Sequence, residues 1–360
     1  MELGIIGLPT SGKTTVFNAL TRSNRPTAAA SMGKLELYSA VVDVPDERVD
    51  ILSRMYHPKK TTYAKVTYTD IAGLDQDLGT KGLPGELRNK IAPMDAFVQV
   101  VRAFEDPRVP HIAGSVNPQR DLDTLEGEFL LADMITVESL LARLQERLQK
   151  GARGDERKAL EESLILLEQF HAALDQNHPL RDLDLSAEAL DSVRGYGLLT
   201  LKPMLVLLNT GEGQGDAPAL LHYPHAKASV LALQGHLEME MSQLAPEEAE
   251  AFMEDFGITQ LARERVIQAS YQLVGLQSFF TVGEDEVRAW TIRVGSTALD
   301  AAGTIHTDLA RGFIRAEVVA YRDLIDAGSM VAARKNAKVH LEGKEYTVAD
   351  ADIVHIRFAV

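Results

Sequence analysis

The 360-residue chain contains no cysteine and only one tryptophan, and no apolar stretch reaches the ~18 residues needed to span a membrane. Disulfide bonds, thiolate chemistry and cysteine-based zinc sites are therefore excluded. The ten histidines are scattered without ligand spacing, so we expect no structural metal. The sequence also begins without a basic and apolar leader segment. These absences favour a cytoplasmic protein with no membrane partner.

Positive charge is also in short supply, because the formal net charge is −15. This balance argues against a DNA partner and restricts any RNA contact to a local surface. Residues 121–200 hold seventeen Asp and Glu against eight Lys and Arg, whereas residues 281–360 hold twelve against ten. An RNA contact is therefore expected in the C-terminal segment. The length predicts two or three domains.

A glycine-rich stretch, Gly7–Thr15, lies between a short apolar run at 3–6 and a segment with helical spacing at 14–20. Its glycines allow successive backbone N–H groups to point toward a phosphate chain at the start of a helix. Lys13 would neutralise the β- and γ-phosphates, and the Thr14 hydroxyl would hold Mg²⁺. The pattern predicts a P-loop, and its strand–helix setting disfavours a chance match in a glycine-rich turn.

A second motif follows an alternating run at 64–71, which ends in Asp70-Ile71-Ala72-Gly73. In open α/β sheets, ligands bind beyond the carboxyl ends of the strands. Alone, Asp-x-x-Gly is more often a plain turn. Downstream of a P-loop, it indicates an aspartate that holds Mg²⁺ through water, followed by a switch glycine.

The remaining pattern indicates a parallel α/β domain with a helical insertion. Strands are expected at 35–44, 95–101, 204–208 and 228–233, with a helix after the N-cap Asp46 and further helices over 246–276. Between the second and third of these strands the apolar residues follow a heptad seam, namely Leu130, Met134, Val137, Leu141, Leu144 and Leu148. This seam predicts a helical hairpin, either a packed structural arm or a surface for a partner.

From Phe279 the sequence becomes rich in β-type residues. Short strands are expected at 287–292, 312–319, 339–340, 345–348 and 353–358, with a helix near 321–326. This alternation is typical of a small β-grasp module.

Taken together, these stretches resemble one family over essentially the whole chain, the YchF or Obg-like ATPase branch of the Obg-related P-loop proteins. The stretches similar to the family's are Gly4–Pro9, Phe17–Thr21, Val44–Arg48, Asp70–Leu74, Val101–Asp106, Val287–Ile292, Gly303–Asp308 and Gly312–Glu317. The resemblance implies a P-loop nucleotide domain over 1–121 and 200–277. It also implies an inserted helical hairpin over 122–199 and a C-terminal TGS domain, a ubiquitin-like β-grasp fold, over 278–360.

The resemblance also implies an activity and partners. We expect a monomeric Mg²⁺-dependent nucleoside triphosphatase that converts ATP to ADP and associates with the ribosome or its RNA through the TGS and helical domains. The residues implied in nucleotide binding are Gly7, Thr10, Ser11, Gly12, Lys13, Thr14, Thr15, Asn209, Thr210 and Glu212. Thr14 would hold Mg²⁺ directly and Asp70 through water, while Gly73 and Leu74 belong to the switch.

Leu74 matches the apolar residue that this branch carries where many GTPases have a water-orienting glutamine. Hydrolysis must then position its water differently, and His111 lies in a loop where relatives also have a histidine. The alternative for His111 is an ordinary surface histidine.

Several positions depart from the family pattern. Counting back without gaps from Val44, Lys34 stands where relatives have the switch threonine that completes the Mg²⁺ shell. The switch glycine loop is altered around 75–77 and 83–84, and Leu231 replaces a small residue. Two functions therefore remain open, a slow ATP-preferring enzyme and a nucleotide-binding adaptor, for ATP or GTP, with little or no turnover.

Overall fold

The computed structural model describes residues 1–27, 36–72, 83–211, 220–255 and 261–359, and it is a mixed α/β structure with two sheets. The chain divides into two compact units. One comprises residues 1–40 and 67–266, and the other comprises residues 41–66 and 267–360. The expected α/β class is confirmed. The expected division into three domains stays a prediction.

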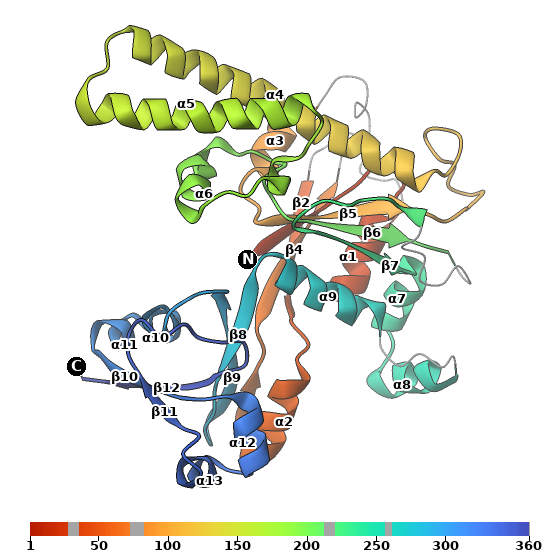
Figure 1. Ribbon diagram of the computed structural model, residues 1–360. Coiled ribbons are helices and arrows are strands. Elements are labelled where there is room, and N and C mark those ends of the chain that lie inside the picture. The colour runs from red at the N-terminus through yellow and green to blue at the C-terminus, as the bar shows by residue number, and fades with distance from the viewer. Residues whose placement is uncertain (28–35, 73–82, 212–219, 256–260, 360) are drawn as a thin grey trace. The chain divides into compact units, whose positions relative to one another are not determined.

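The sheet of the first unit has six strands in the order β2-β4-β1-β5-β6-β7 (Figure 1). Their bounds are β1 Glu2–Ile6, β2 Glu36–Asp43, β4 Lys65–Ala72, β5 Ala96–Arg102, β6 Met204–Asn209 and β7 Ala228–Leu233. β1 pairs in parallel with both β4 and β5, and β6 pairs in parallel with β5 and β7. Every residue of β5 and β6 is buried, as expected for central parallel strands. The carboxyl ends of β1, β4 and β6 therefore lie along one edge.

The helices of this unit cover the sheet and close its core. They are α1 Lys13–Thr21, α3 Gly85–Ile91, α7 Gly235–Ser242, α8 Pro246–Asp255 and the first part of α9 Ala262–Leu273. One core cluster of the unit contains Ile6, Phe97, Phe129 and Val206, all nearly inaccessible to solvent. The strands at 35–44, 95–101, 204–208 and 228–233 are thus confirmed within a residue or two. The helix α3 was not foreseen.

The heptad seam lies in a helical hairpin, as expected. α4 runs from Pro118 to Gln149 and α5 from Gly154 to Asp175, and the two pack side by side (Figure 1). α4 begins twelve residues before the seam, where the Asn117 side chain accepts a hydrogen bond from the Arg120 N–H. Two short turns, η1 Leu180–Asp182 and η2 Arg194–Tyr196, and the helix α6 Ala187–Val193 complete the arm. None of the described helices is both long enough and apolar enough to cross a membrane.

The second unit contains a six-stranded sheet in the order β11-β10-β12-β8-β9-β3. Its elements are α2 Glu47–Tyr56, β3 Lys60–Thr62, β8 Leu276–Thr281, β9 Glu286–Arg293, α10 Ala298–Ile305, α11 Thr307–Arg311, β10 Phe313–Val319, α12 Tyr321–Ala327, α13 Met330–Lys335, β11 His340–Glu342 and β12 Ile353–Phe358. Asp46 caps α2 as expected, accepting from the Arg48 N–H.

One expected strand of this unit is wrong. Residues 345–348 form a turn whose β contact is an isolated bridge between Thr297 and Thr347. Val348 instead packs into the core with Phe279 and Val354, so its apolar character reflects burial beside a loop rather than a strand. The short strand β3 was not expected, and it pairs in parallel with β9.

Candidate functional site

The loop between β1 and α1 curls tightly enough to turn its backbone inward. Gly12, just before α1, has φ +92°, and a Cβ there would lie 2.2 Å from Asn209 Nδ2. A Cβ on Gly7 would lie 2.4 Å from the Val100 carbonyl oxygen. Thr10 also takes a left-handed conformation, with φ +60°. Both glycines are thus required by close approach, as the sequence predicted for a phosphate-binding loop.

Lys13 lies over this loop. Its Nζ donates hydrogen bonds to the carbonyl oxygens of Gly7 at 3.1 Å and Leu8 at 2.9 Å, and the residue is 8% exposed. The first turn of α1 carries no acidic residue, so the positive end of the helix dipole and the charge of Lys13 act together. Thr15 is half-buried in the same turn. This arrangement suits an anion such as a phosphate chain.

Asp70 reaches the same place from the carboxyl end of β4. Its Oδ2 accepts a hydrogen bond from Thr14 Oγ1 at 3.0 Å and pairs with Arg25 Nη1 at 2.6 Å. Asp70 is fully buried, and its Oδ1 has no hydrogen-bond partner among the described residues. Burial raises the pKa of Asp70, and the Thr14 hydrogen bond and the charge of Arg25 partly oppose that rise.

These oxygens fit Mg²⁺, which usually takes one or two protein ligands and completes its shell with water and phosphate oxygens. Thr14 Oγ1 and the carboxylate of Asp70 are hard oxygen donors beside the lysine, and Asp70 Oδ1 remains unpaired within the described part of the chain. In the described residues there is no cluster of three or more His, Asp or Glu side chains that would hold a metal by itself.

Asn209, at the end of β6, is bonded to the loop. Its Nδ2 donates to the Ser11 carbonyl oxygen at 3.0 Å, and its Oδ1 accepts from the Gly235 N–H at 3.1 Å. Thr210 is buried, and its N–H donates to the Leu233 carbonyl oxygen at 3.0 Å. The Asn209 side chain therefore braces the backbone of the P-loop, whereas Thr210 bonds to the end of β7.

Glu212, Gly73 and Leu74 lie outside the described residues. The same holds for Lys34, the position expected to carry the switch threonine. Ser11 is 2% exposed, and its Oγ has no partner in the described part of the chain.

Arg102 braces the loop from beneath and was not assigned a role from the sequence. It is 2% exposed, and its guanidinium donates to Thr10 Oγ1 at 3.2 Å and to the carbonyl oxygens of Phe104 at 3.1 Å and Val109 at 2.8 Å. Its plane also lies 4.4 Å from the Phe104 ring centroid. The available signal was an arginine at the end of a central strand, where a buried charge needs several hydrogen-bond partners.

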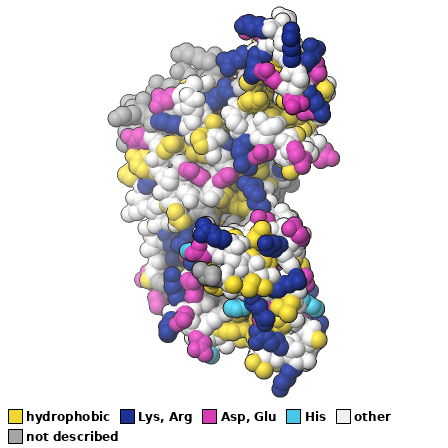
Figure 2. All heavy atoms as spheres, turned by 90° about the vertical axis from the view of Figure 1, so that its left-hand side faces the viewer, with side chains coloured by type: hydrophobic (Ala, Val, Ile, Leu, Met, Phe, Trp, Pro, Cys, Tyr) yellow, Lys and Arg dark blue, Asp and Glu magenta, His cyan; other side chains and the backbone are white. Residues whose placement is uncertain are grey.

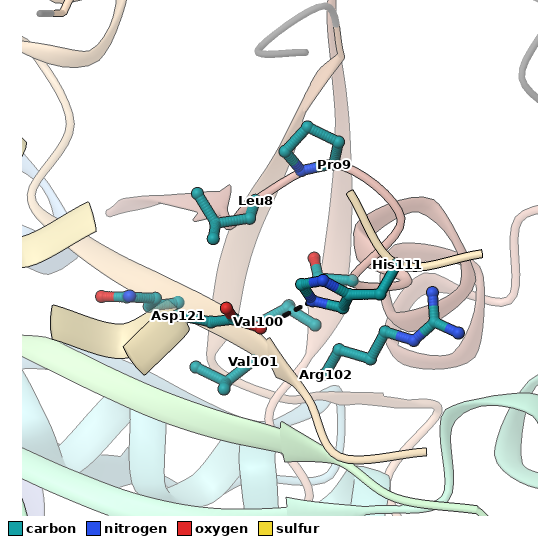
Figure 3. Close-up of a pocket in the computed structure, with 9 residues that line it drawn as sticks. Leu8, Pro9, Val100, Val101, Arg102, His111 and Asp121 are labelled. Atoms are coloured by element: carbon teal, nitrogen blue, oxygen red, sulfur yellow. Dashed lines mark hydrogen bonds and ion pairs between the residues drawn. The ribbon is translucent and has the colours of Figure 1, made fainter. Parts of the chain in front are cut away.

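His111 lies in a small pocket beneath the loop, lined also by Leu8, Pro9 and Arg102 (Figure 3). Its ring points at Asp121, with Nε2 and Oδ2 2.8 Å apart, and its Nδ1 accepts from the Ala113 N–H at 3.1 Å. Because Nδ1 is an acceptor, the proton of a neutral ring lies on Nε2 and faces Asp121. Both ring nitrogens are therefore engaged, and His111 would have to leave Asp121 to orient a water.

The first strand of the parallel sheet leads through a glycine loop into a helix, a lysine lies over the loop, and a threonine–aspartate pair lies beside it. Together these features define the P-loop class of α/β proteins. A model described as YchF-GTPase_C, a protein of unknown function (DUF933), matches residues 276–359.

Comparison with known proteins shows the family. It is 38% identical over 369 residues to the ribosome-binding ATPase YchF of Bacillus subtilis (strain 168), covering all of both chains. It is 38% identical to the protein of the same description from Escherichia coli O157:H7, covering 100% and 99%. The solved structure of the Schizosaccharomyces pombe YchF GTPase matches with a TM-score of 0.84 at 33% identity, covering 99% of this chain and 97% of that one. The chain belongs to the YchF family.

Proposed function

We propose that the chain is a ribosome-associated nucleoside triphosphatase that prefers ATP and hydrolyses it slowly to ADP and phosphate. The observation that carries the proposal is the set of Lys13, Thr14 and Asp70 around a tightly curled glycine loop. The descriptions of its relatives as ribosome-binding ATPases support the ribosomal part. We also propose a cytoplasmic monomer with the nucleotide, helical and TGS domains at the boundaries given above.

In this proposal the chain contributes mainly charge and position. Lys13 releases the carbonyl oxygens of Gly7 and Leu8 and binds the β- and γ-phosphates, while the backbone N–H groups of the loop and of the first turn of α1 surround the phosphate oxygens. Thr14 and Asp70 would hold Mg²⁺, which when bound neutralises charge that develops on the phosphates. His111 is the candidate for orienting water, by the family resemblance.

The preference for adenine is inferred from the segment Asn209-Thr210-Gly211-Glu212. Guanine-specific relatives carry Asn-Lys-x-Asp, whose aspartate accepts hydrogen bonds from guanine N1–H and the 2-amino group. Here a threonine replaces the lysine, and the carboxylate is on a longer side chain. A site that does not depend on the guanine edge leaves no buried carboxylate unpaired when adenine binds, so adenine can compete. The Asn209 amide uses its oxygen for Gly235 and one of its two N–H groups for Ser11. Its second N–H group is the one that would donate to a base.

The second function, a nucleotide-binding adaptor with little or no turnover, is favoured by Lys34 at the switch threonine position. Phosphate release from the purified protein separates the two functions, with Lys13→Ala as the inactive control. Release by wild type above the Lys13→Ala background supports the enzyme, and equal release supports the adaptor. If Lys34 limits turnover, Lys34→Thr raises it.

Competition between ATP and GTP for a fluorescent nucleotide tests the base preference. Tighter ATP binding supports the proposal, whereas GTP binding tighter by about tenfold, or about 1.4 kcal/mol, overturns it.

A further inference from the structure

Arg25 contacts the carboxylate that was assigned to the metal. Its Nη1 lies 2.6 Å from Asp70 Oδ2, and the same oxygen accepts the hydrogen bond from Thr14 Oγ1 at 3.0 Å. The Asp70 side chain has no exposed area, while that of Arg25 is 21% exposed. A monovalent cation therefore occupies the oxygen that joins the two residues proposed to hold Mg²⁺.

The position of Arg25 is fixed by its surroundings. Asn18, which is 1% exposed, donates from Nδ2 to the Arg25 carbonyl oxygen at 2.8 Å and accepts from the Arg25 N–H at 3.1 Å. The ring centroid of Tyr38 in β2 lies 3.3 Å from Cζ of the Arg25 guanidinium. The backbone is thus held by a side chain of α1, and the charged group is stacked on an aromatic ring.

We propose that Arg25 is a tethered cation that competes with the divalent metal for Asp70, so that its release sets the Mg²⁺ concentration at which the nucleotide site loads. The inference rests on the proposed function, because it concerns the metal of that same site. A guanidinium in contact with the Asp70 carboxylate puts a positive charge where the divalent ion and the water that links it to Asp70 have to lie, and the two cations repel each other strongly. Arg25 therefore has to leave Asp70 before the metal binds there.

Two features make such an exchange feasible. The contact of Asn18 is with the backbone of Arg25, so the side chain can swing away while the tether stays in place. The partly exposed guanidinium also regains water when it leaves. The alternative is a purely structural ion pair that neutralises Asp70, which would affect folding stability and leave the metal requirement of the intact site unchanged.

The experiment compares Arg25→Gln with Arg22→Gln, which removes the same charge from an exposed position in the same segment. The Mg²⁺ concentration for half-maximal binding of a fluorescent ATP analogue is measured for both and for wild type. We expect Arg25→Gln to lower it by about three- to tenfold, the range expected for loss of one partly buried ion pair. Arg22→Gln and the charge-conserving Arg25→Lys should stay within about twofold of wild type. An unchanged requirement in a folded Arg25→Gln protein overturns the inference.

A second readout does not depend on nucleotide. Binding of Mn²⁺ alone, followed by electron paramagnetic resonance, should tighten by a similar factor in Arg25→Gln, and Asp70→Asn should abolish the difference. If wild type binds no nucleotide, the proposed function fails, and this metal titration still decides whether Arg25 competes for Asp70. Should Arg25→Gln not fold, Tyr38→Leu removes the ring that stacks on the guanidinium while leaving Arg25 in place, and it should shift both titrations in the same direction. Equal Mn²⁺ affinity in the folded variants overturns the inference.

Discussion

Asn209 and Ser11 are 198 residues apart in sequence, yet Asn209 Nδ2 donates a hydrogen bond to the Ser11 carbonyl oxygen at 3.0 Å. The other end of the same amide accepts from the Gly235 N–H. One buried side chain thus joins the end of β6, the start of α7 and the P-loop. The shape of the loop depends on this amide as well as on its own glycines.

Removing the amide tests that dependence. Asn209→Ala leaves the Ser11 carbonyl and the Gly235 N–H without this partner, which should cost about 1–3 kcal/mol in free energy of unfolding. The loop should also bind nucleotide more weakly. Urea unfolding and fluorescent-nucleotide titration measure the two effects. A variant that loses stability but keeps wild-type affinity would show that the loop holds its shape without Asn209.

Gly12→Ala should weaken nucleotide binding more than the strain from its positive φ alone would. The new methyl group would be 2.2 Å from Asn209 Nδ2, so the brace has to move. Gly151→Ala is the matched control, because Gly151 has a nearly identical φ of +95° and open space around it. We expect the control to lose about 1 kcal/mol of stability and keep nucleotide binding, whereas Gly12→Ala loses binding. Equal effects on binding would rule out the steric explanation.

We expect ribosome binding to involve the basic residues in and just after α13, namely Arg334, Lys335 and Lys338. In the structure these residues differ in their ion pairs. Arg334 pairs with Glu317 at 2.7 Å, and Lys338 pairs with Asp323 at 3.0 Å. Lys335 is exposed and makes no ion pair with a described residue. On the face shown in Figure 2, acidic side chains lie among the basic ones.

We therefore predict that Lys335→Glu weakens co-sedimentation with ribosomes at low salt more than Lys338→Glu does. Phosphate contacts release counterions, so the difference should shrink as salt is raised. Lys227→Glu, exposed just before β7 and outside the TGS and helical domains, is the control for a lost charge elsewhere. Unchanged co-sedimentation of the triple reversal at Arg334, Lys335 and Lys338 would contradict a role for this group.

The elements that the sequence predicted are those whose signals are local. The glycines, Lys13 and Thr14 lie in one short stretch, and β5 and β6 are mostly apolar, so their positions could be read without tertiary contacts. Asp70 was expected near the end of a strand, and it lies two residues before the end of β4.

What the sequence could not show depends on pairing over long separations. The Arg25–Asp70 contact joins residues that are 45 positions apart in sequence. The sequence around neither residue indicates that the other is its partner. The three-residue strand β3 forms only because β9 offers it an edge. The alternating residues at 345–348 are typical of a strand, but this segment is a turn. Val348 is buried because it packs in the core with residues of α10 and β10. Local propensity was overridden by tertiary packing there.

Lys202 gives a prediction on pH. Its Nζ donates to the carbonyl oxygens of Ala92, at 2.7 Å, and Met94, at the end of α3. Burial lowers the pKa of Lys202 to about 8, and Asp95 and Asp133 oppose that shift. The unfolded chain keeps the ordinary lysine pKa of about 10.4. Between these two values the unfolded chain holds a proton that the native protein has released, so the contribution of Lys202 to stability increases as pH rises from 8 to 10.

The comparison that isolates this contribution is wild type against Lys202→Met, with unfolding free energies measured in urea at pH 7 and pH 10. The difference, wild type minus variant, should become more favourable to wild type by about 1–3 kcal/mol over that range, at 1.36 kcal/mol for each unit of pKa difference. Lys150→Met is the control, because the Lys150 side chain is 71% exposed and its difference from wild type should stay flat. A flat difference for Lys202→Met would mean that the hydrogen bonds to Ala92 and Met94 keep the ammonium charged in the folded protein.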